Sequence, residues 1–381
     1  MSLFLLSFFL LYGLLHVYAY LKCRAAIDLS RKSSLFLAAF IALMISSPLI
    51  IRIGENAGLE ITVRILSYIS YIWMGVLFLF IASAVLFDLF RIMVVLISLV
   101  AGMKAKSFIP SAKMTFYIPL CIALIISIYG YFEARTIQTE HITISSPKIS
   151  ADPGKLRIVQ ISDVHIGLIV RDSRLKSIMR IVEEASPDIL VSTGDLVDGQ
   201  INRLAGLSEL LDSVKPRYGK YAITGNHEFY AGLTQALSFT ERAGFTILRG
   251  ETADIEGIIS ITGVDDKQAH AFGLFKGPQE SELLSELSRQ TFNVLLKHRP
   301  MQTGSRHRFF DLQLSGHTHK GQIFPFSLLT KWYFPYHAGH IHFDNNSHLY
   351  ISRGTGTWGP PVRFLSPPEV TVIDLVHSKM G

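Results

Sequence analysis

The chain has 381 residues, of which 49% are hydrophobic and only 17% are charged, and its mean hydropathy is +0.35. A soluble domain usually carries about a quarter charged residues, so this composition argues against a single water-soluble globule. Residues 1–131 hold 10 Lys and Arg against 4 Asp and Glu, whereas residues 132–381 hold 26 of each kind. The net charge of +6 therefore lies in the first third, which indicates a membrane segment with basic loops. Because the remainder is balanced, no nucleic-acid partner is expected.

Cysteine and histidine are also distributed unequally between the two parts of the chain. The two cysteines, Cys23 and Cys121, both lie in the apolar third, so no disulfide framework can support the polar part. Histidine is distributed in the opposite sense, since 13 of the 14 lie after residue 131.

Four uncharged, apolar runs in the first third come close to the roughly 20 residues that a helix needs to cross a bilayer. They span residues 1–21, 33–51, 65–87 and 114–132, and they predict a membrane-anchoring segment over residues 1–132. A further stretch, 92–103, is uncharged but too short to span, and the charges flanking it predict an interfacial helix. The first run lacks the basic start and the cleavage site of a signal peptide, which favours a retained span over a cleaved signal.

Loop charge predicts the orientation of these spans. The loops 22–32 and 88–113 each carry four basic residues, so the positive-inside rule places both in the cytoplasm of a multi-pass inner or plasma membrane protein. Four spans then leave the amino terminus and everything after residue 132 outside the cytoplasm. If residues 92–103 crossed the membrane as well, the side would be reversed.

The polar part has the pattern of an α/β domain. Residues 133–155 lack periodicity and are predicted to be a linker with at most one edge strand. From 156 to 376, short β-branched runs alternate with helical stretches, which predicts polar chemistry at the carboxyl ends of the strands. The predicted strands are 156–161, 188–192, 220–224, 258–264, 292–297, 312–315 and 349–353. The predicted helices are 172–185, 203–213, 231–243 and 279–288.

Five of these strands end in residues of the types that bind metals. The terminating motifs are SDVHIG, TGDLVDG, TGNHEFY, KHRP and SGHTHKG, which carry Asp163, His165, Asp195, Asp198, Asn226, His227, Glu228, His298, His317 and His319. Each motif alone has an ordinary explanation as a turn or a polar pair. Five in order are typical of a metal site, because carboxylate, amide and imidazole ligands suit manganese, iron or zinc. Neighbouring glycines allow the sharp turns that bring such short side chains together.

The series DVH, GDLVDG, GNHE, a single His and GHTH resembles the calcineurin-like metallophosphoesterase superfamily over about residues 155–376. The run YISRGTGTWGPPVRF and the apolar helices ahead of the domain are similar to its membrane-associated bacterial branch. The resemblance implies two facing mixed sheets flanked by helices. It also implies a centre with two divalent cations, for which manganese is expected and iron or zinc are the alternatives.

The resemblance also implies a role for each matching residue. The first cation would be bound by Asp163, His165 and His319, the second by Asn226, His298 and His317, and Asp195 would bridge the two. His227 would donate a hydrogen bond or a proton to the leaving oxygen, and Asp198 would keep that imidazole protonated and oriented. Glu228 would not bind a cation itself but would lie behind the residues that do. The implied reaction is hydrolysis of a phosphate ester or pyrophosphate bond by a water that the two cations activate.

Two positions depart from the family pattern. Gly199 stands where members that act on phosphoproteins usually carry arginine, which argues against phosphoprotein as the substrate. Lys320 stands at the first of the two glycines that usually follow GHTH, and it is either a positive charge for a phosphate or an ordinary solvated lysine.

An aromatic insertion, FPFSLLTKWYFPYHAGHIHF, follows the last ligand motif. Its aromatic residues, with Trp332 and Phe334 as the expected substrate contacts, are either core residues or an apolar wall that lies against a bilayer. The second reading predicts a lipid-linked phosphate as substrate. The alternative to an enzyme is a metal-binding sensor or scaffold, but such degenerate domains lose ligands and this chain has the complete set.

Overall fold

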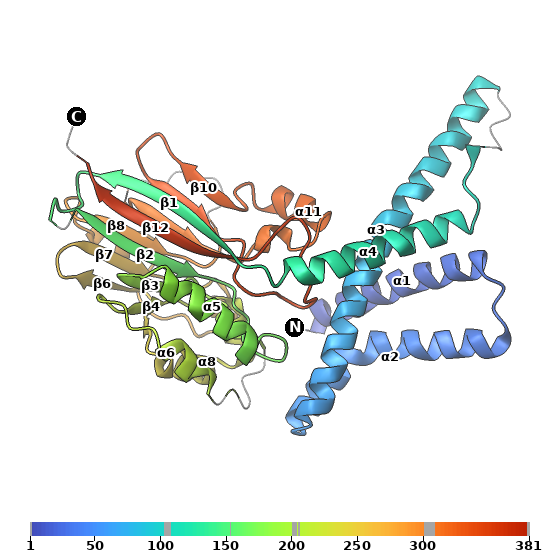
Figure 1. Cartoon of the computed structure of the whole chain (residues 1–381), viewed down its shortest axis with the longest axis horizontal. Coiled ribbons are helices and arrows are strands. Elements are labelled where there is room, and N and C mark those ends of the chain that lie inside the picture. Colours follow the sequence, from blue (N-terminus) through green and yellow to red (C-terminus); the bar gives the residue numbers. More distant parts are fainter. Residues whose placement is uncertain are drawn as a thin grey trace. The chain divides into compact units, whose positions relative to one another are not determined.

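The computed structural model describes residues 2–102, 108–152, 154–199, 204, 206–300 and 309–378. The chain forms two compact units. The first is Met1–Phe132 with Gly359–Val362, and the second is Glu133–Trp358 with Arg363–Gly381 (Figure 1). Part of the predicted helix 203–213 and of the predicted loop 88–113 lies outside the described residues.

The first unit contains four helices that are long and apolar enough to cross a membrane. They are α1 (Ser2–Ala26), α2 (Arg31–Asn56), α3 (Glu60–Ala101) and α4 (Met114–Glu133). Each contains one of the four predicted spans. Helices α2 and α3 approach closely, because a Cβ at Gly54 would lie 2.5 Å from Cγ2 of Val63.

The prediction of a separate interfacial helix at 92–103 is wrong, because α3 runs without interruption to Ala101. Between Gly75 and Gly102 the sequence has neither proline nor glycine to break a helix, and the helix ends on Gly102 in the left-handed conformation. The charge of Asp88 does not end the helix, since α1 supplies its partners. Lys22 forms an ion pair with this carboxylate, and the Tyr18 hydroxyl donates to it at 2.6 Å.

The second unit is built around two six-stranded sheets, so the α/β fold class is confirmed. The first sheet has the order β1 (Gln138–Ser146), β12 (Glu369–His377), β2 (Lys155–Ile161), β3 (Ile189–Ser192), β4 (Lys220–Ala222) and β5 (Thr246–Ile247). The second has the order β10 (Gly339–His342), β11 (His348–Ile351), β9 (Leu312–Ser315), β8 (Phe292–Leu296), β7 (Ile259–Gly263) and β6 (Glu251–Ile255). Both sheets are mixed, because β12 runs antiparallel to β2, and β10 and β6 run antiparallel to their neighbours.

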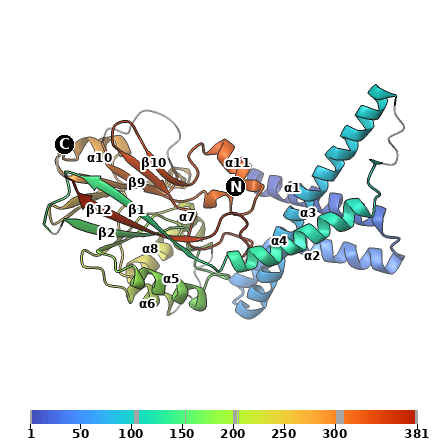
Figure 2. The same ribbon diagram turned by 45° about the horizontal axis from the view of Figure 1, so that its top comes forward.

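The helices of this unit are α5 (Asp172–Glu184), α6 (Leu207–Asp212), α7 (Asn226–Ala231), α8 (Leu233–Arg242), α9 (Gln268–Ala271), α10 (Glu280–Glu286) and α11 (Phe326–Tyr333). Helices α5, α6 and α8 cover one face of the first sheet (Figures 1 and 2), and α10 packs against the second. The side chains of β2 alternate between two cores. Val159 and Ile161 pack with α5, α6 and α8, whereas Leu156 and Ile158 pack between the two sheets. This double burial explains why the parallel strands are continuous apolar runs.

All seven predicted strands are present, but the sequence reading missed β12, which lies between β1 and β2. It also missed the short strands β5, β6 and β10 and the helix α11. The segment 133–155, expected to be a linker with one edge strand, contains β1, which pairs with β12 in parallel register from Gln138 to Ser146. This sheet arrangement brings the ends of β2, β3, β4, β8 and β9 together.

Candidate metal centre

The predicted ligands lie in the turns that follow the strands, and five of them have left-handed backbone conformations. Their φ angles are 52° at Asp163, 54° at His165, 51° at Asp195, 71° at His317 and 47° at His319. Positive φ is uncommon outside glycine, and such strain is held in place at functional sites by the surrounding structure. These turns therefore point their side chains inward at a cost in backbone energy.

Glycines make room for this convergence. A Cβ at Gly225 would collide with the carboxylate and the backbone nitrogen of Asp195, and a Cβ at Gly316 would collide with Ser162 and the Asp163 carboxylate. The glycines of the GNH and GHTH motifs are needed because the backbone passes directly against another motif's side chain.

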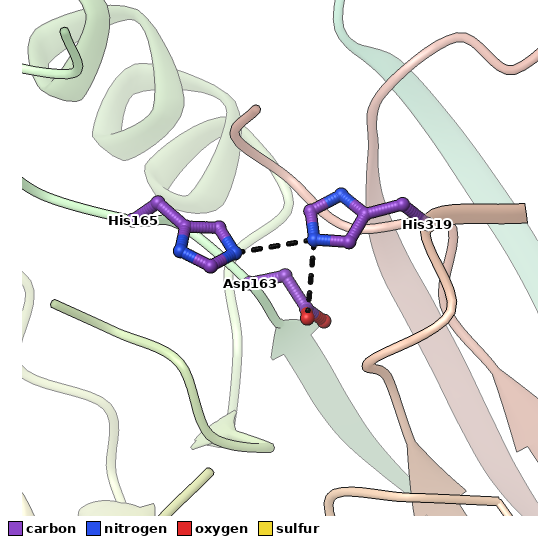
Figure 3. A group of neighbouring side chains, drawn as sticks. All are labelled: Asp163, His165 and His319. Atoms are coloured by element: carbon purple, nitrogen blue, oxygen red, sulfur yellow. Dashed lines mark hydrogen bonds and ion pairs between the residues drawn. The ribbon is translucent and has the colours of Figure 1, made fainter. Parts of the chain in front are cut away.

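The first group of ligand atoms comes from Asp163, His165 and His319 (Figure 3). Nε2 of His165 lies 3.1 Å from Nε2 of His319, and the same His319 nitrogen lies 3.4 Å from Oδ1 of Asp163. All three residues are buried. Two imidazole nitrogens and a carboxylate oxygen that face one point in a buried place are a donor set that fits one divalent transition-metal ion.

The second group comes from Asp195, His298 and His317. Nε2 of His298 lies 3.3 Å from Oδ2 of Asp195 and 3.2 Å from Nδ1 of His317. The other ring nitrogen of His298, Nδ1, lies 2.8 Å from the carbonyl of Thr193, to which it can donate. A metal-binding histidine is usually oriented by such a hydrogen bond, so the donor set fits a second cation.

Asn226 is the remaining predicted ligand of the second cation. Its side chain is buried at the start of α7, and its Oδ1 lies 3.4 Å from the Arg299 guanidinium. Arg299 is held in turn by Asp266, with Nε donating to Oδ2 at 2.7 Å.

Asp195 joins the two groups. Its Oδ2 lies 3.3 Å from Nε2 of His298 in the second group and 3.9 Å from Nε2 of His165 in the first. Its Oδ1 accepts a hydrogen bond of 2.8 Å from the backbone nitrogen of His227. Burial opposes ionisation of this carboxyl, but His298 and His227 outweigh burial and hold its pKa well below the usual range. A carboxylate in this position can bridge two cations.

His227 and Asp198 form a pair beside these groups. Nδ1 of His227 lies 3.0 Å from Oδ1 of Asp198. Burial disfavours the charged imidazole, yet Asp195 and Asp198 outweigh it and raise the pKa of His227 to about 9. His227 also lies within ligand distance of His165 and Asp195, but its Nδ1 is already paired with Asp198.

Glu228 ties two of the motifs together, a role that the sequence did not specify. Its buried carboxylate accepts hydrogen bonds from the backbone nitrogens of Gly225 at 2.7 Å, Leu196 at 2.8 Å and Asp195 at 3.1 Å. Burial and the charge of Asp195 raise the pKa of Glu228 to about 7. The residue fixes the turn that carries Asp195 against the turn that carries Asn226.

Arg363 was missed by sequence reasoning. It is fully buried, and its Nη2 lies 3.0 Å from Nδ1 of His319. The guanidinium also donates to the carbonyls of Gly356 and Arg353 at 2.6 Å and of Ser366 at 3.1 Å. The only signal in the sequence was an arginine in the run TWGPPVRF.

The three predicted substrate contacts lie in different surroundings. Phe334 is only 8% exposed, and its ring packs edge-on against His317 at 5.6 Å between centroids. Trp332 is 83% exposed on α11, so the two do not form one wall. Lys320 follows His319 in a left-handed turn. Trp358 lies beside His227, with 6.5 Å between the ring centroids, and it is 53% exposed.

Comparisons with known proteins show the family to which the chain belongs. The sequence profile of the calcineurin-like phosphoesterases matches residues 156–321, which include all seven predicted ligands. A metallophosphoesterase of Aquifex aeolicus is 36% identical over 67% of this chain and 97% of its own length. The chain belongs to the calcineurin-like phosphoesterase family.

One further relative matches nearly the whole chain, and others match about half to two thirds of it. A metallophosphoesterase of Campylobacter jejuni is 28% identical over 97% of both chains. A transmembrane protein with a metallophosphoesterase domain from Danio rerio is 31% identical over 67% of this chain and 61% of that protein. Among solved structures, a dimetal phosphatase from Danio rerio is 14% identical with a TM-score of 0.33, covering 52% of this chain and 87% of that one.

Family membership and the clustered ligands together identify a metal-dependent phosphoesterase. The prediction of this superfamily from the strand-end motifs is therefore confirmed, and so is the prediction that the chain is an enzyme of this class.

Proposed function

We propose that this phosphoesterase binds two divalent cations, manganese as the expected metal, and hydrolyses a phosphate ester or pyrophosphate bond. Asp163, His165 and His319 hold one cation, and Asn226, His298 and His317 hold the other. The observation that carries the proposal is the position of the Asp195 carboxylate, whose Oδ2 lies within 4 Å of a histidine nitrogen from each group. A carboxylate that is shared between two cations has to face both groups of ligands.

When bound, the cation pair supplies an activated water and stabilises the charge on the transferred phosphoryl group. The chain's own residues supply the proton for the leaving oxygen. Since Asp198 holds Nδ1 of His227, Nε2 is the nitrogen that delivers this proton. The raised pKa of His227, about 9, keeps the ring protonated near neutral pH, as a general acid requires.

The substrate that we propose is a lipid-linked phosphate. Helix α11 exposes several large apolar side chains, namely Phe326, Leu328, Leu329, Trp332 and Tyr333. Exposed patches of this kind mark contacts with membranes or partners, and tryptophan and tyrosine are favoured at the bilayer surface. The helix ends on Phe334, which packs on the ligand His317, so the patch adjoins the metal centre within the second unit.

The test uses the full chain in detergent micelles, loaded with Mn²⁺. Leu328→Ser with Leu329→Ser should lower turnover of a phospholipid monoester in mixed micelles by about tenfold, because two apolar contacts with lipid are lost. Turnover of soluble bis-p-nitrophenyl phosphate should stay unchanged. Leu274→Ser, at an exposed leucine outside α11, is the matched control and should affect neither substrate.

Equal loss on both substrates would mean that α11 supports the fold, and no loss on the lipid would reject the lipid-linked substrate. A chain that binds both cations and turns over no ester, diester or pyrophosphate would support the alternative of a sensor or scaffold.

A further inference from the structure

A second group of histidines lies on the strands β10 and β11, and none of its members is a predicted ligand of the metal centre. His340 and His342 alternate along β10, so they point to the same face of the sheet. In the antiparallel register His342 lies opposite His348 of β11. Three imidazoles therefore share one face at the end of the second sheet, where β10 is the terminal strand.

The ring of His348 contacts the rings of both other histidines. Nε2 of His340 lies 3.0 Å from Nδ1 of His348, and these rings stack at 5.1 Å between centroids. The rings of His342 and His348 are nearly parallel, at 9° and 4.6 Å. Two nitrogens that each lie about 2.0–2.1 Å from one tetrahedral metal are separated by about 3.3–3.4 Å, close to the observed 3.0 Å.

The nitrogens of His342 do not converge with those of His340 and His348 as the side chain stands, so a third ligand requires this side chain to rotate. Directly opposed residues of an antiparallel pair have Cβ atoms about 4.5–5.5 Å apart. Rotation of the His342 side chain, with the backbone unchanged, then brings one of its nitrogens towards the pair formed by His340 and His348.

Two of the three imidazoles, His340 and His348, are held in the neutral form that metal binding needs. Burial, His340 and His342 together lower the pKa of His348 to about 4. Burial and His342 also lower the pKa of His340. Since a histidine must be neutral to bind a cation, these rings are ready to bind at neutral pH.

We propose that His340, His342 and His348 form a separate transition-metal site that binds an imidazole-preferring divalent cation of the zinc, copper and nickel class. A ligand set made only of imidazoles favours these ions over manganese or magnesium, whereas the mixed oxygen and nitrogen set of the metal centre accepts manganese. A cation held in this way links the terminal strand β10 to β11. The proposal does not depend on the proposed function of the metal centre.

The experiment counts zinc on the full chain in detergent. The protein is stripped with chelator, equilibrated with micromolar Zn²⁺ and analysed for zinc per chain. The combined variant His340→Gln, His342→Gln and His348→Gln should bind one zinc ion fewer than the wild type. His141→Gln, at an exposed histidine of β1, is the matched control and should bind as many as the wild type.

Two further measurements separate the outcomes. The triple variant should keep the wild-type melting temperature without zinc and the wild-type turnover with Mn²⁺, which shows that its fold and its metal centre are intact. Equal zinc content in the wild type and the triple variant would overturn the proposal, whatever the result at the metal centre.

Discussion

At the scale of single residues, the pair of His227 and Asp198 makes the first prediction. Changing His227→Gln removes the proton donor, so kcat for an alkyl phosphate ester should fall by about 10²–10⁴. For p-nitrophenyl esters, whose leaving group needs little protonation, the fall should be much smaller. Steady-state kinetics on the two ester classes measure the difference.

Asp198→Asn keeps the imidazole but removes the negative charge that holds its proton, and it should show the same leaving-group dependence with a smaller loss. If both variants lost activity equally on both esters, His227 would act on the metal centre and not on the leaving oxygen.

Arg363 makes the second prediction, because its hydrogen bonds to three backbone carbonyls fix the loop that packs against the His319 ring. Arg363→Lys keeps the charge but cannot span the carbonyls of Gly356, Arg353 and Ser366 together with the His319 ring. Loss of a residue that orients a ligand typically costs about 10–100-fold in metal affinity. Titration with Mn²⁺, followed by activity and by bound metal, measures that affinity.

Arg289→Lys, at an exposed arginine, serves as the control and should leave the Mn²⁺ affinity unchanged. Unchanged affinity in Arg363→Lys would show that the guanidinium only fills space.

The sequence drew attention to the Asp and His residues that the structure brings together, but not to the residues around them. Ligand types were visible because each follows a strand in a short motif, as with Asp163 and His317. The partnership of Arg363 with His319 joins positions 44 residues apart and depends on how two loops fold over each other. The environment of Phe334 was equally hidden, because burial beside His317 follows from the unpredicted helix α11.

At the scale of elements, the turn between β4 and α7 makes the third prediction. Gly225→Ala would push a methyl group into the carboxylate and backbone of Asp195, so the variant should lose bound metal and activity. Gly199→Ala is the matched control in the turn after β3, since a Cβ there would meet no described atom within 4 Å. Metal analysis and circular dichroism of both variants test this. Full metal content in Gly225→Ala would contradict the close approach.

The contact between α1 and α3 makes the fourth prediction. Asp88→Leu leaves Lys22 without its ion-pair partner, and the loss of one member of such a pair costs about 3–5 kcal/mol when it is buried. The melting temperature in detergent should therefore fall. In the double variant Lys22→Met with Asp88→Leu, the melting temperature should return most of the way to the wild-type value. A melting temperature that stays low would show that the ion pair does not set the stability.

Whole elements were predictable where periodicity was strong. The apolar runs and the parallel strands appeared in the sequence as unbroken hydrophobic stretches. The extension of α3 through Asp88 was not predictable, since the charge is accommodated by partners on α1. The central strand β12 was missed because it follows a long loop and pairs with β1 and β2 from the far end of the domain.

At the scale of the whole molecule, the division seen in the composition corresponds to two structural units. We propose that the chain is a multi-pass membrane protein with its phosphoesterase domain outside the cytoplasm. With Cys23 and Cys121 replaced by serine, Ser281→Cys places a single thiol on an exposed position of α10. A membrane-impermeant maleimide should label it in intact cells.

Ser30→Cys, in the predicted cytoplasmic loop, should be labelled only after lysis. The reverse pattern would place the domain in the cytoplasm.

The central claim is a phosphoesterase centre with two cations bridged by Asp195. The most direct measurement is metal content and bis-p-nitrophenyl phosphate turnover of the Mn²⁺-loaded full chain, compared between wild type and Asp195→Asn under conditions that leave the histidine site on β10 and β11 empty. The wild type should hold two manganese ions and turn over the substrate, and Asp195→Asn should lose at least one ion and nearly all turnover. Full turnover by Asp195→Asn would contradict the two-metal centre.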